Sequence, residues 1–315
     1  MLPGSADLEQ VRPDRGHRVH PGVLRDLRQR GPGQIQHRRR VGHRAAQTVE
    51  GGARNGTGSD RVARRYPGVM ATPADLYAAI LADPDDLDLR RRYADAIETT
   101  DPERADLIRL DLEGADGTRE MLFLHRRIHP RLADPVAHLL VDWRIRNGLI
   151  ESVTMTARTL IDHGDEVWAH HPVRHLVLTE AAGLMTDVAQ VACLDRLVAL
   201  DLRGNPIGDD GLATLVDSPH LRRIRWLGLA RCGIGPAGAE TLAATRNLPA
   251  LRYVDLRRNP VEVTAQGHGQ HIDGSPVWVE MPPLGQELIA RYGPLPWLDI
   301  QWGWKLYSIA LWDEV

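Results

Sequence analysis

Two stretches of the sequence repeat each other: residues 197–215 read LVALDLRGNPIGDDGLATL, and residues 224–242 read IRWLGLARCGIGPAGAETL. The matching positions keep a constant offset of 27 residues: Leu200 and Leu227, Leu202 and Leu229, Asn205 and Cys232, Ile207 and Ile234, Leu215 and Leu242. A third copy, LRYVDLRRNPVEV at residues 251–263, continues the offset, and weaker units (VRHLVL, 173–178; IESVTM, 150–155) come before. A period of this length predicts a stack of similar units with one shared core.

The units share one predicted arrangement of strand, turn and helix. The leucines of the LxL core alternate with other residues, which predicts a short strand with both leucines pointing inward. Asn205 and Asn259 can hydrogen-bond the backbone where the chain leaves the strand, and the segments GDDGLATLV and GPAGAETLA read as return helices. One unit cannot bury its apolar side alone, so stacking is required.

The pattern resembles the leucine-rich repeat, LxxLxLxx(N/C)xL, in its longer helix-bearing form found in ribonuclease-inhibitor-like proteins. This resemblance implies an α/β fold for residues 149–263, a solenoid of about five units with a parallel sheet and outer helices. It also implies protein–protein recognition on the concave side of the sheet. Cys232 falls at the (N/C) position and is expected to be a buried ladder residue, and Cys193 a packed small hydrophobe.

Capping signals predict a helical N-terminal module over residues 70–148. Thr72, Asp86 and Asp101 are good N-caps, and Pro73 and Pro102 suit the first helical turn. Apolar stripes follow each cap, and further helices fit residues 119–128 and 136–146, the latter closed by Gly148.

Part of this module resembles the bacterial repeat-companion domain, a short helical module found upstream of repeat arrays. The resemblance covers about forty residues, from Leu76 to Glu113, and the family carries no established chemistry. Where the family usually shows Trp-Leu-Glu-Glu after Ala-Asp, this chain has Ala96-Ile97-Glu98-Thr99. The matching residues are Ala82-Asp83-Pro84-Asp85-Asp86, Arg90, Tyr93-Ala94-Asp95, Ala105 and Ile108-Arg109-Leu110.

Strand alternation assigns the side chains of the concave face. The outward positions, unit by unit, are Ser152, Thr154 and Thr156; His175, Val177 and Thr179; Ala199, Asp201 and Arg203; Trp226, Gly228 and Ala230; Tyr253, Asp255 and Arg257. Aromatic residues ringed by charges are typical of binding hot spots. We therefore predict a partner-binding site made of Trp226, Tyr253, Asp201, Asp255, Arg203, Arg257 and His175. The alternative is that the C-terminal segment of the same chain covers Trp226 and Tyr253.

That C-terminal segment, residues 264–315, holds five of the eight tryptophans. PVWVEM and LDIQWGWKLYSIALW alternate as strands do, and solenoids need capped ends, so we expect a Trp-rich cap. The alternative to a cap is that this segment holds a glycan- or metal-dependent site.

Residues 1–69 carry 14 arginines and 6 acidic residues, a net charge of +8, whereas the other 246 residues carry 25 basic and 36 acidic side chains. The first segment lacks Phe, Trp and any apolar period, so we expect disorder. A working basic arm would bind nucleic acid. That arm is the alternative: we expect translation to start at Met70 and no nucleic-acid partner.

Motifs of catalysis and metal binding are absent. The sequence has no GxxxxGK(S/T), GxSxG or HExxH, and its two cysteines exclude a disulfide scaffold and a four-thiolate zinc site. The histidine groups HHPVRH (170–175) and HGQH (268–271) read as loop and surface histidines.

These observations predict a non-enzymatic scaffold without catalytic residues, cofactor or bound metal. We expect an unidentified protein partner, no membrane segment, a cytoplasmic location and no small-molecule ligand that the sequence can name.

Overall fold

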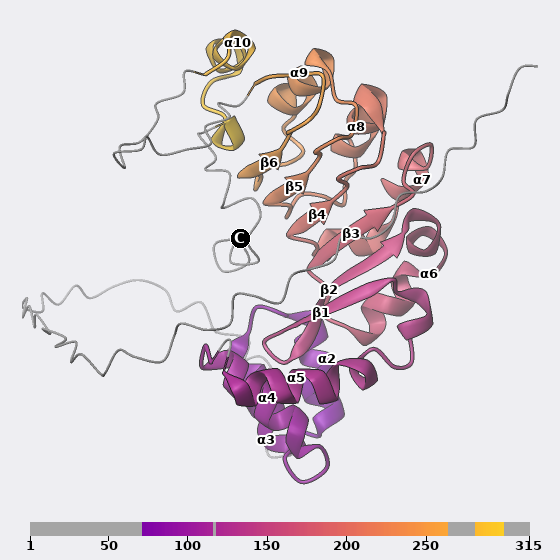
Figure 1. Ribbon diagram of the computed structural model, residues 1–315, viewed down its shortest axis with the longest axis vertical. Coiled ribbons are helices and arrows are strands. Elements are labelled where there is room, and N and C mark those ends of the chain that lie inside the picture. The colour runs from indigo at the N-terminus through magenta and orange to yellow at the C-terminus, as the bar shows by residue number, and fades with distance from the viewer. Residues whose placement is uncertain (1–70, 116–117, 264–280, 299–315) are drawn as a thin grey trace, which may run out of the picture. The chain divides into compact units, whose positions relative to one another are not determined.

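The computed structural model describes residues 71–115, 118–263 and 281–298, all within one compact unit, Asn55–Val315. They form a mixed α/β structure in which helices lie along one side of a six-stranded sheet (Figure 1). None of the helices in these ranges is long and apolar enough to cross a bilayer.

Among the described residues, four α-helices precede the sheet, each begun by a side-chain cap. Thr72, Asp86, Asp101 and Thr118 accept hydrogen bonds from backbone N–H groups of the first turn, which satisfies donors that have no partner inside the helix. The three caps predicted from the sequence are confirmed. The helices are α2 (Pro73–Ala82), α3 (Leu87–Ile97), α4 (Pro102–Leu112) and α5 (Arg119–Leu132).

The helix expected over residues 136–146 is wrong. Residues Ala137–Leu139 form a 3-10 turn, η1, and Asp142–Arg146 form strand β1, which pairs antiparallel with β2 (Leu149–Thr156). Asn147 and Gly148 join the two strands with φ of 48° and 71°, the backbone of a two-residue hairpin turn. Gly148 therefore closes a hairpin and not a helix.

The sheet follows chain order, and every pair after the first is parallel. Its later strands are β3 (His175–Thr179), β4 (Ala199–Asp201), β5 (Trp226–Gly228) and β6 (Tyr253–Asp255). The returning segments contain α6 (Ala157–His170), α7 (Met185–Val188), η2 (Ala192–Arg196), α8 (Gly208–Val216) and α9 (Pro236–Ala244). The last described elements are α10 (Pro283–Tyr292) and η3 (Pro296–Leu298).

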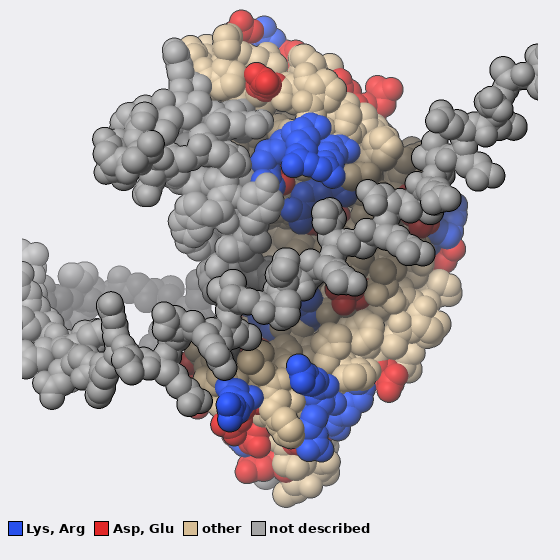
Figure 2. All heavy atoms as spheres, viewed as in Figure 1, with Lys and Arg blue, Asp and Glu red and all other residues tan. Residues whose placement is uncertain are grey.

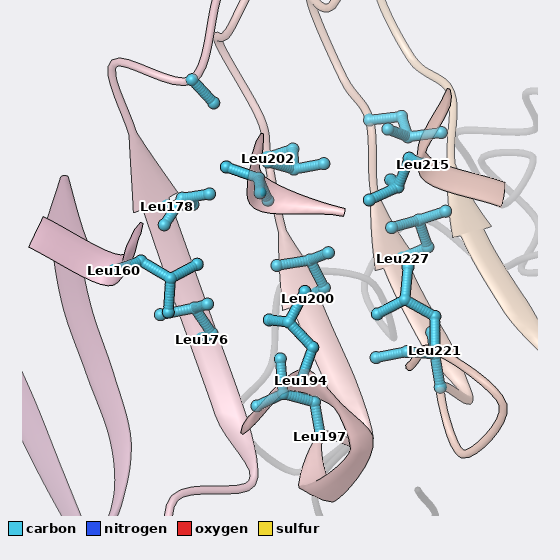
Figure 3. Close-up of a cluster of buried hydrophobic side chains, with 14 of the residues drawn as sticks. Leu160, Leu176, Leu178, Leu194, Leu197, Leu200, Leu202, Leu215, Leu221 and Leu227 are labelled. Carbon is cyan, nitrogen blue, oxygen red and sulfur yellow. The ribbon is translucent and has the colours of Figure 1, made fainter. Parts of the chain in front are cut away.

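Leucines of successive repeats make one continuous core between the sheet and the helices (Figure 3). Leu176, Leu200 and Leu227 are aligned on neighbouring strands and are at most 1% exposed. Leu107 and Ile128 from the N-terminal helices join the same cluster, and so do Trp297 and Leu298 at the other end. The core therefore runs from α4 and α5 through the repeats to η3.

Asparagine side chains hold the turns after the strands. The Asn205 amide donates to the carbonyls of Leu178 and Leu202, both at 2.8 Å, and accepts from the N–H of Ala181 at 2.9 Å. Asn259, two repeats further along the chain, makes the same kind of contacts. Cys232 takes the equivalent place between them, fully buried, with its thiol donating to the Leu202 carbonyl at 3.1 Å. Burial raises its pKa to about 11 and that of Cys193 to about 12, so both thiols stay protonated near neutral pH.

A buried ion pair joins the N-terminal helices to the first parallel strand. Arg90 on α3 lies 2.6 Å from Glu151 on β2, and their side chains are 1% and 6% exposed. The guanidinium also donates to the carbonyls of Pro84 and Asn147. Burial raises the pKa of Glu151, and the charge of Arg90 opposes that rise. Nearby, the Tyr77 hydroxyl donates to the carbonyl of His170 at 2.8 Å.

Candidate recognition face

The side of the sheet away from the helices, called here the helix-free face, corresponds to the concave face expected from the sequence. Strand pairing aligns its side chains in two rows: Ser152, His175, Ala199, Trp226 and Tyr253; then Thr154, Val177, Asp201, Gly228 and Asp255. Ala199, Trp226 and Tyr253 pack together in a cluster separate from the main core. The two-residue alternation predicted from the sequence therefore holds across all five parallel strands.

Two Asp–Arg pairs lie on this face, in the first and third of the three clearest repeats. Arg203 Nε is 2.9 Å from both carboxylate oxygens of Asp201, and Arg257 Nε is 2.7 Å from Asp255 Oδ1. Each carboxylate also accepts the backbone N–H of its arginine, at 3.0 and 3.2 Å. Both arginines lie just past the ends of β4 and β6, and the Asp-Leu-Arg spacing lets each aspartate accept the backbone N–H two residues further on, as in an Asx turn.

Burial within each pair is unequal. The side chains of Asp201 and Asp255 are 5% and 0% exposed, whereas those of Arg203 and Arg257 are 39% and 13% exposed. A buried carboxylate therefore fixes a guanidinium group that lies nearer the surface. Basic side chains gather over the part of the molecule where β4, β5 and β6 lie (Figure 2).

The middle repeat has Gly228 and Ala230 where its neighbours have Asp and Arg. The Trp226 indole occupies the space left by these small residues: a Cβ placed on Gly228 would meet its Cη2 atom at 2.5 Å. The Arg203 guanidinium lies 5.6 Å from the centre of the Trp226 ring, and the His175 ring meets it edge-on at 6.0 Å. Aromatic and cationic groups thus pack against each other along the face.

Trp226 is only 6% exposed, so the expectation that it faces solvent is wrong. It lies on the helix-free face as predicted and packs with Ala199 and Tyr253, and its indole N–H has no hydrogen-bond partner among the described residues. Tyr253 and Arg203 are the more accessible members of the predicted site. Exposure depends on which side chains fold over one another, and strand alternation does not carry that information.

A family model described as "Leucine Rich repeat" matches residues 197–216, the stretch that contains Asp201, Arg203 and Asn205. The chain has leucine-rich repeat character. The match falls on the repeat of β4 and α8, where the leucine and asparagine ladders are both complete. A search of curated proteins found no match.

Burial keeps two histidines of the leucine-rich repeat segment, His171 and His175, in the neutral form near pH 7. Burial lowers the pKa of His175 to about 4, against the opposing effect of Asp201, and burial likewise lowers that of His171 to about 4. The Nδ1–H of His170 donates to the carbonyl of Glu166 at 2.8 Å, within its own helix. No group of three metal-binding side chains occurs among the residues that the structure describes. His268 and His271 lie outside those residues.

Sequence reasoning missed a pocket on the helix side of the leucine-rich repeats. It has a volume of about 540 Å³ and lies between α6 and the α7–η2 segment. Its lining includes the carboxylates Asp162, Asp165, Glu166 and Asp187 together with Leu160, Ile161 and Val191. The only signal in the sequence was the acidic run of α6, which resembles any solvated helix face.

The C-terminal expectations are tested only at Trp297, which is 3% exposed and belongs to the main core. Trp278, Trp302, Trp304 and Trp312 lie outside the described residues, as do most of both expected strands and any cover that they would give to Trp226. The glycan- or metal-dependent site and the Arg-rich segment 1–69 also lie outside them. The described C-terminal residues add a helix, α10, that the sequence reading did not predict.

Proposed function

We propose that this chain is a non-enzymatic scaffold that binds a protein partner on the helix-free face of its leucine-rich repeats. Arg203, Arg257 and Tyr253 would contact the partner directly. Trp226 would serve as the platform beneath them, with His175 at its edge, while Asp201 and Asp255 would hold the two arginines in place.

The observation that carries this proposal is the fixed geometry of the Asp–Arg pairs. Each guanidinium is held by a nearly buried aspartate carboxylate, and that carboxylate also accepts the backbone N–H of the same arginine. Arginine, tyrosine and tryptophan are the residues that dominate binding energy in protein interfaces. Side chains held in one conformation before binding lose less entropy when a partner arrives, which favours affinity.

The test compares two full-length variants with the unmodified chain as bait for affinity capture from cells that express it. The face variant carries Asp201→Asn, Arg203→Gln, Asp255→Asn, Arg257→Gln and Tyr253→Ala; changing both members of each pair avoids leaving a buried charge alone. The control carries Thr214→Arg and Thr241→Arg, at equivalent positions of α8 and α9 on the helix side. Circular dichroism and thermal unfolding establish that both variants fold.

We expect a protein captured by the unmodified chain and by the helix-side control to be lost from the face variant. Capture that survives in a folded face variant, or disappears only in the control, would place the binding surface elsewhere. Purified chain and captured protein, mixed at known concentrations, then give the affinity ratio for each variant.

Two finer assignments belong to the same proposal. The helices α2 to α5 would be a repeat-companion module of bacterial type, supported by the motif around Asp85 and Tyr93. A cytoplasmic location is supported by the two free, buried cysteines, Cys193 and Cys232, which suit a reducing compartment.

A further inference from the structure

Arginines collect at a second place, the edge of the sheet where the parallel strands begin. The segments that lead into β3 to β6, residues 171–174, 189–198, 217–225 and 245–252, form this strand-start edge. They contain seven arginines and two acidic residues, Asp195 and Asp217. All of these arginines except Arg174 are exposed: Arg196, Arg222, Arg223, Arg225, Arg246 and Arg252.

Backbone hydrogen bonds show that three of these arginines stand in one row. The N–H of Arg252 donates to the carbonyl of Arg225 at 2.9 Å, and the N–H of Arg225 donates to that of Val198 at 2.8 Å. Val198 in turn donates to Arg174 at 2.9 Å. Neighbouring strands are about 4.8 Å apart, so Arg252 lies one strand spacing from Arg225, and Arg225 lies two spacings from Arg174, with Val198 between them.

One carboxylate of the chain already binds to this edge. Asp85, in the loop between α2 and α3, makes ion pairs with Arg174 and with Arg223, whose Nη2 is 3.4 Å from Asp85 Oδ2. Arg174 leads into β3 and Arg223 into β5, so a single aspartate bridges arginines from different repeats. The structure therefore contains an example of the ligand chemistry that the edge accepts.

Beyond Asp85, the edge continues past Arg222, Arg225 and Arg252 toward β6. Guanidinium groups bind carboxylates through paired, charge-assisted hydrogen bonds, and arginine keeps its charge at every physiological pH. A single-stranded nucleic acid would be expected to stack its bases on aromatic side chains, but the four segments contain no Phe, Tyr or Trp. The chemistry of this edge favours a protein ligand with spaced carboxylates.

We propose that the strand-start edge binds an acidic peptide segment of a protein partner, in line with the carboxylate of Asp85. This surface is separate from the helix-free face, so the proposal goes beyond the function proposed above and does not depend on it. The partner's glutamates and aspartates pair with Arg222, Arg225 and Arg252.

The experiment measures fluorescence anisotropy of a labelled ten-residue peptide of alternating Glu and Ser, titrated with the full chain at low and at physiological salt. The edge variant carries Arg222→Gln, Arg225→Gln and Arg252→Gln. A control of equal charge change carries Arg119→Gln, Arg126→Gln and Arg158→Gln, which are exposed arginines of α5 and α6. Circular dichroism and thermal unfolding are recorded for both.

We expect the edge variant to weaken binding at least tenfold and the control to change it less than twofold. Asp85→Asn removes the internal competitor for Arg174 and Arg223 and should strengthen binding severalfold. Because this variant keeps all the edge arginines, it still tests the proposal if the triple variant does not fold. The helix-free face variant should bind the peptide normally.

Several results would overturn the proposal. These are no binding by the unmodified chain, equal losses in the edge variant and its control, or weaker binding in Asp85→Asn. Loss of peptide binding in the face variant would assign the carboxylate site to Arg203 and Arg257. A ten-nucleotide oligo-dT that bound the edge more tightly than the peptide would make it a nucleic-acid surface.

Discussion

The indole of Trp226 lies against Gly228, two residues further along the same strand, so closely that no other residue fits at 228 without displacing it. A Cβ at this position would be 2.5 Å from Trp226 Cη2 and 2.8 Å from Asp201 Oδ1. The large aromatic side chain and the missing one are therefore a matched pair. Together they fill the space between the Asp201–Arg203 and Asp255–Arg257 pairs.

Gly228→Ala should lower the free energy of unfolding by about 1–3 kcal/mol, because the new methyl group overpacks against the indole. Urea unfolding measures the change, and the near-UV circular dichroism of the folded protein should shift as Trp226 moves. In a Trp226→Leu background the same alanine should cost clearly less, since the clash is removed. Equal costs in both backgrounds would show that Trp226 does not set the requirement for glycine.

Asn205→Ala should destabilise the protein by about 2–4 kcal/mol. The substitution leaves the buried carbonyls of Leu178 and Leu202 and the N–H of Ala181 without the amide that now satisfies them. The matched control is Asn247→Ala, an exposed asparagine whose loss should change stability by no more than about 0.5 kcal/mol. Similar losses of stability in the two variants would show that the hydrogen bonds of Asn205 do not hold the turn.

Arg90→Met should cost about 3–5 kcal/mol, because it leaves the Glu151 carboxylate buried and uncompensated between α3 and β2. Burial already raises the pKa of Glu151, and loss of Arg90 should raise it further, so the variant should regain stability as the pH falls through that pKa. The double variant Arg90→Met/Glu151→Leu should be more stable than Arg90→Met alone at pH 7. A double variant no more stable than Arg90→Met would show that the uncompensated Glu151 carboxylate is not the source of the cost.

Acid should weaken the fold through His171 before the carboxylates titrate fully. Its pKa is lowered from 6.5 to about 4 in the folded chain, so the unfolded state takes up the proton first as the pH falls. The stability that this site contributes is complete above pH 6.5 and declines down to about pH 4, by at most about 3 kcal/mol. His175 adds a parallel effect.

The check is urea unfolding of the unmodified chain and of His171→Leu at pH 7.5 and pH 5. The variant should lose less stability between these pH values than the unmodified chain loses. Substitution of the exposed His138 by Gln should leave the pH dependence unchanged. If His171→Leu and His138→Gln behaved alike, the buried imidazole would not be the sensitive group.

The turn after each strand offers a stabilising change. Arg231 and Arg258 adopt left-handed backbone conformations, with φ of 58° and 59°, at the position where the preceding repeat has Gly204 with φ of 83°. A side chain in this region is strained, so Arg231→Gly should raise the free energy of unfolding by up to about 1 kcal/mol. The reverse change, Gly204→Arg, should lower it, and opposite signs in thermal unfolding are the expected result.

Local signals in the sequence were sufficient wherever a residue interacts with its near neighbours along the chain. The caps Thr72, Asp86 and Asp101 were readable because each bonds to the turn that follows it. Residues 136–146 were misread because Val136, Leu139, Leu140 and Trp143 have helical spacing. The structure instead uses Trp143 on a strand, where its ring stacks on His129 at 4.9 Å and its N–H donates to the His129 carbonyl. The dipeptide Asn147-Gly148 was the overlooked signal, since it is the preferred pair for a tight hairpin.

By itself the sequence determined the repeat, its 27-residue spacing, the inward leucines and the side of the sheet on which Asp201, Trp226 and Tyr253 lie. These follow from periodicity, because equivalent residues of stacked units must occupy equivalent places. Only the tertiary structure decided that Trp226 is buried, that Arg90 pairs with Glu151, and that Asp85 reaches arginines of two repeats. Such contacts join residues up to 138 positions apart, and their energy depends on the distance and solvent access of each pair, which no local pattern encodes.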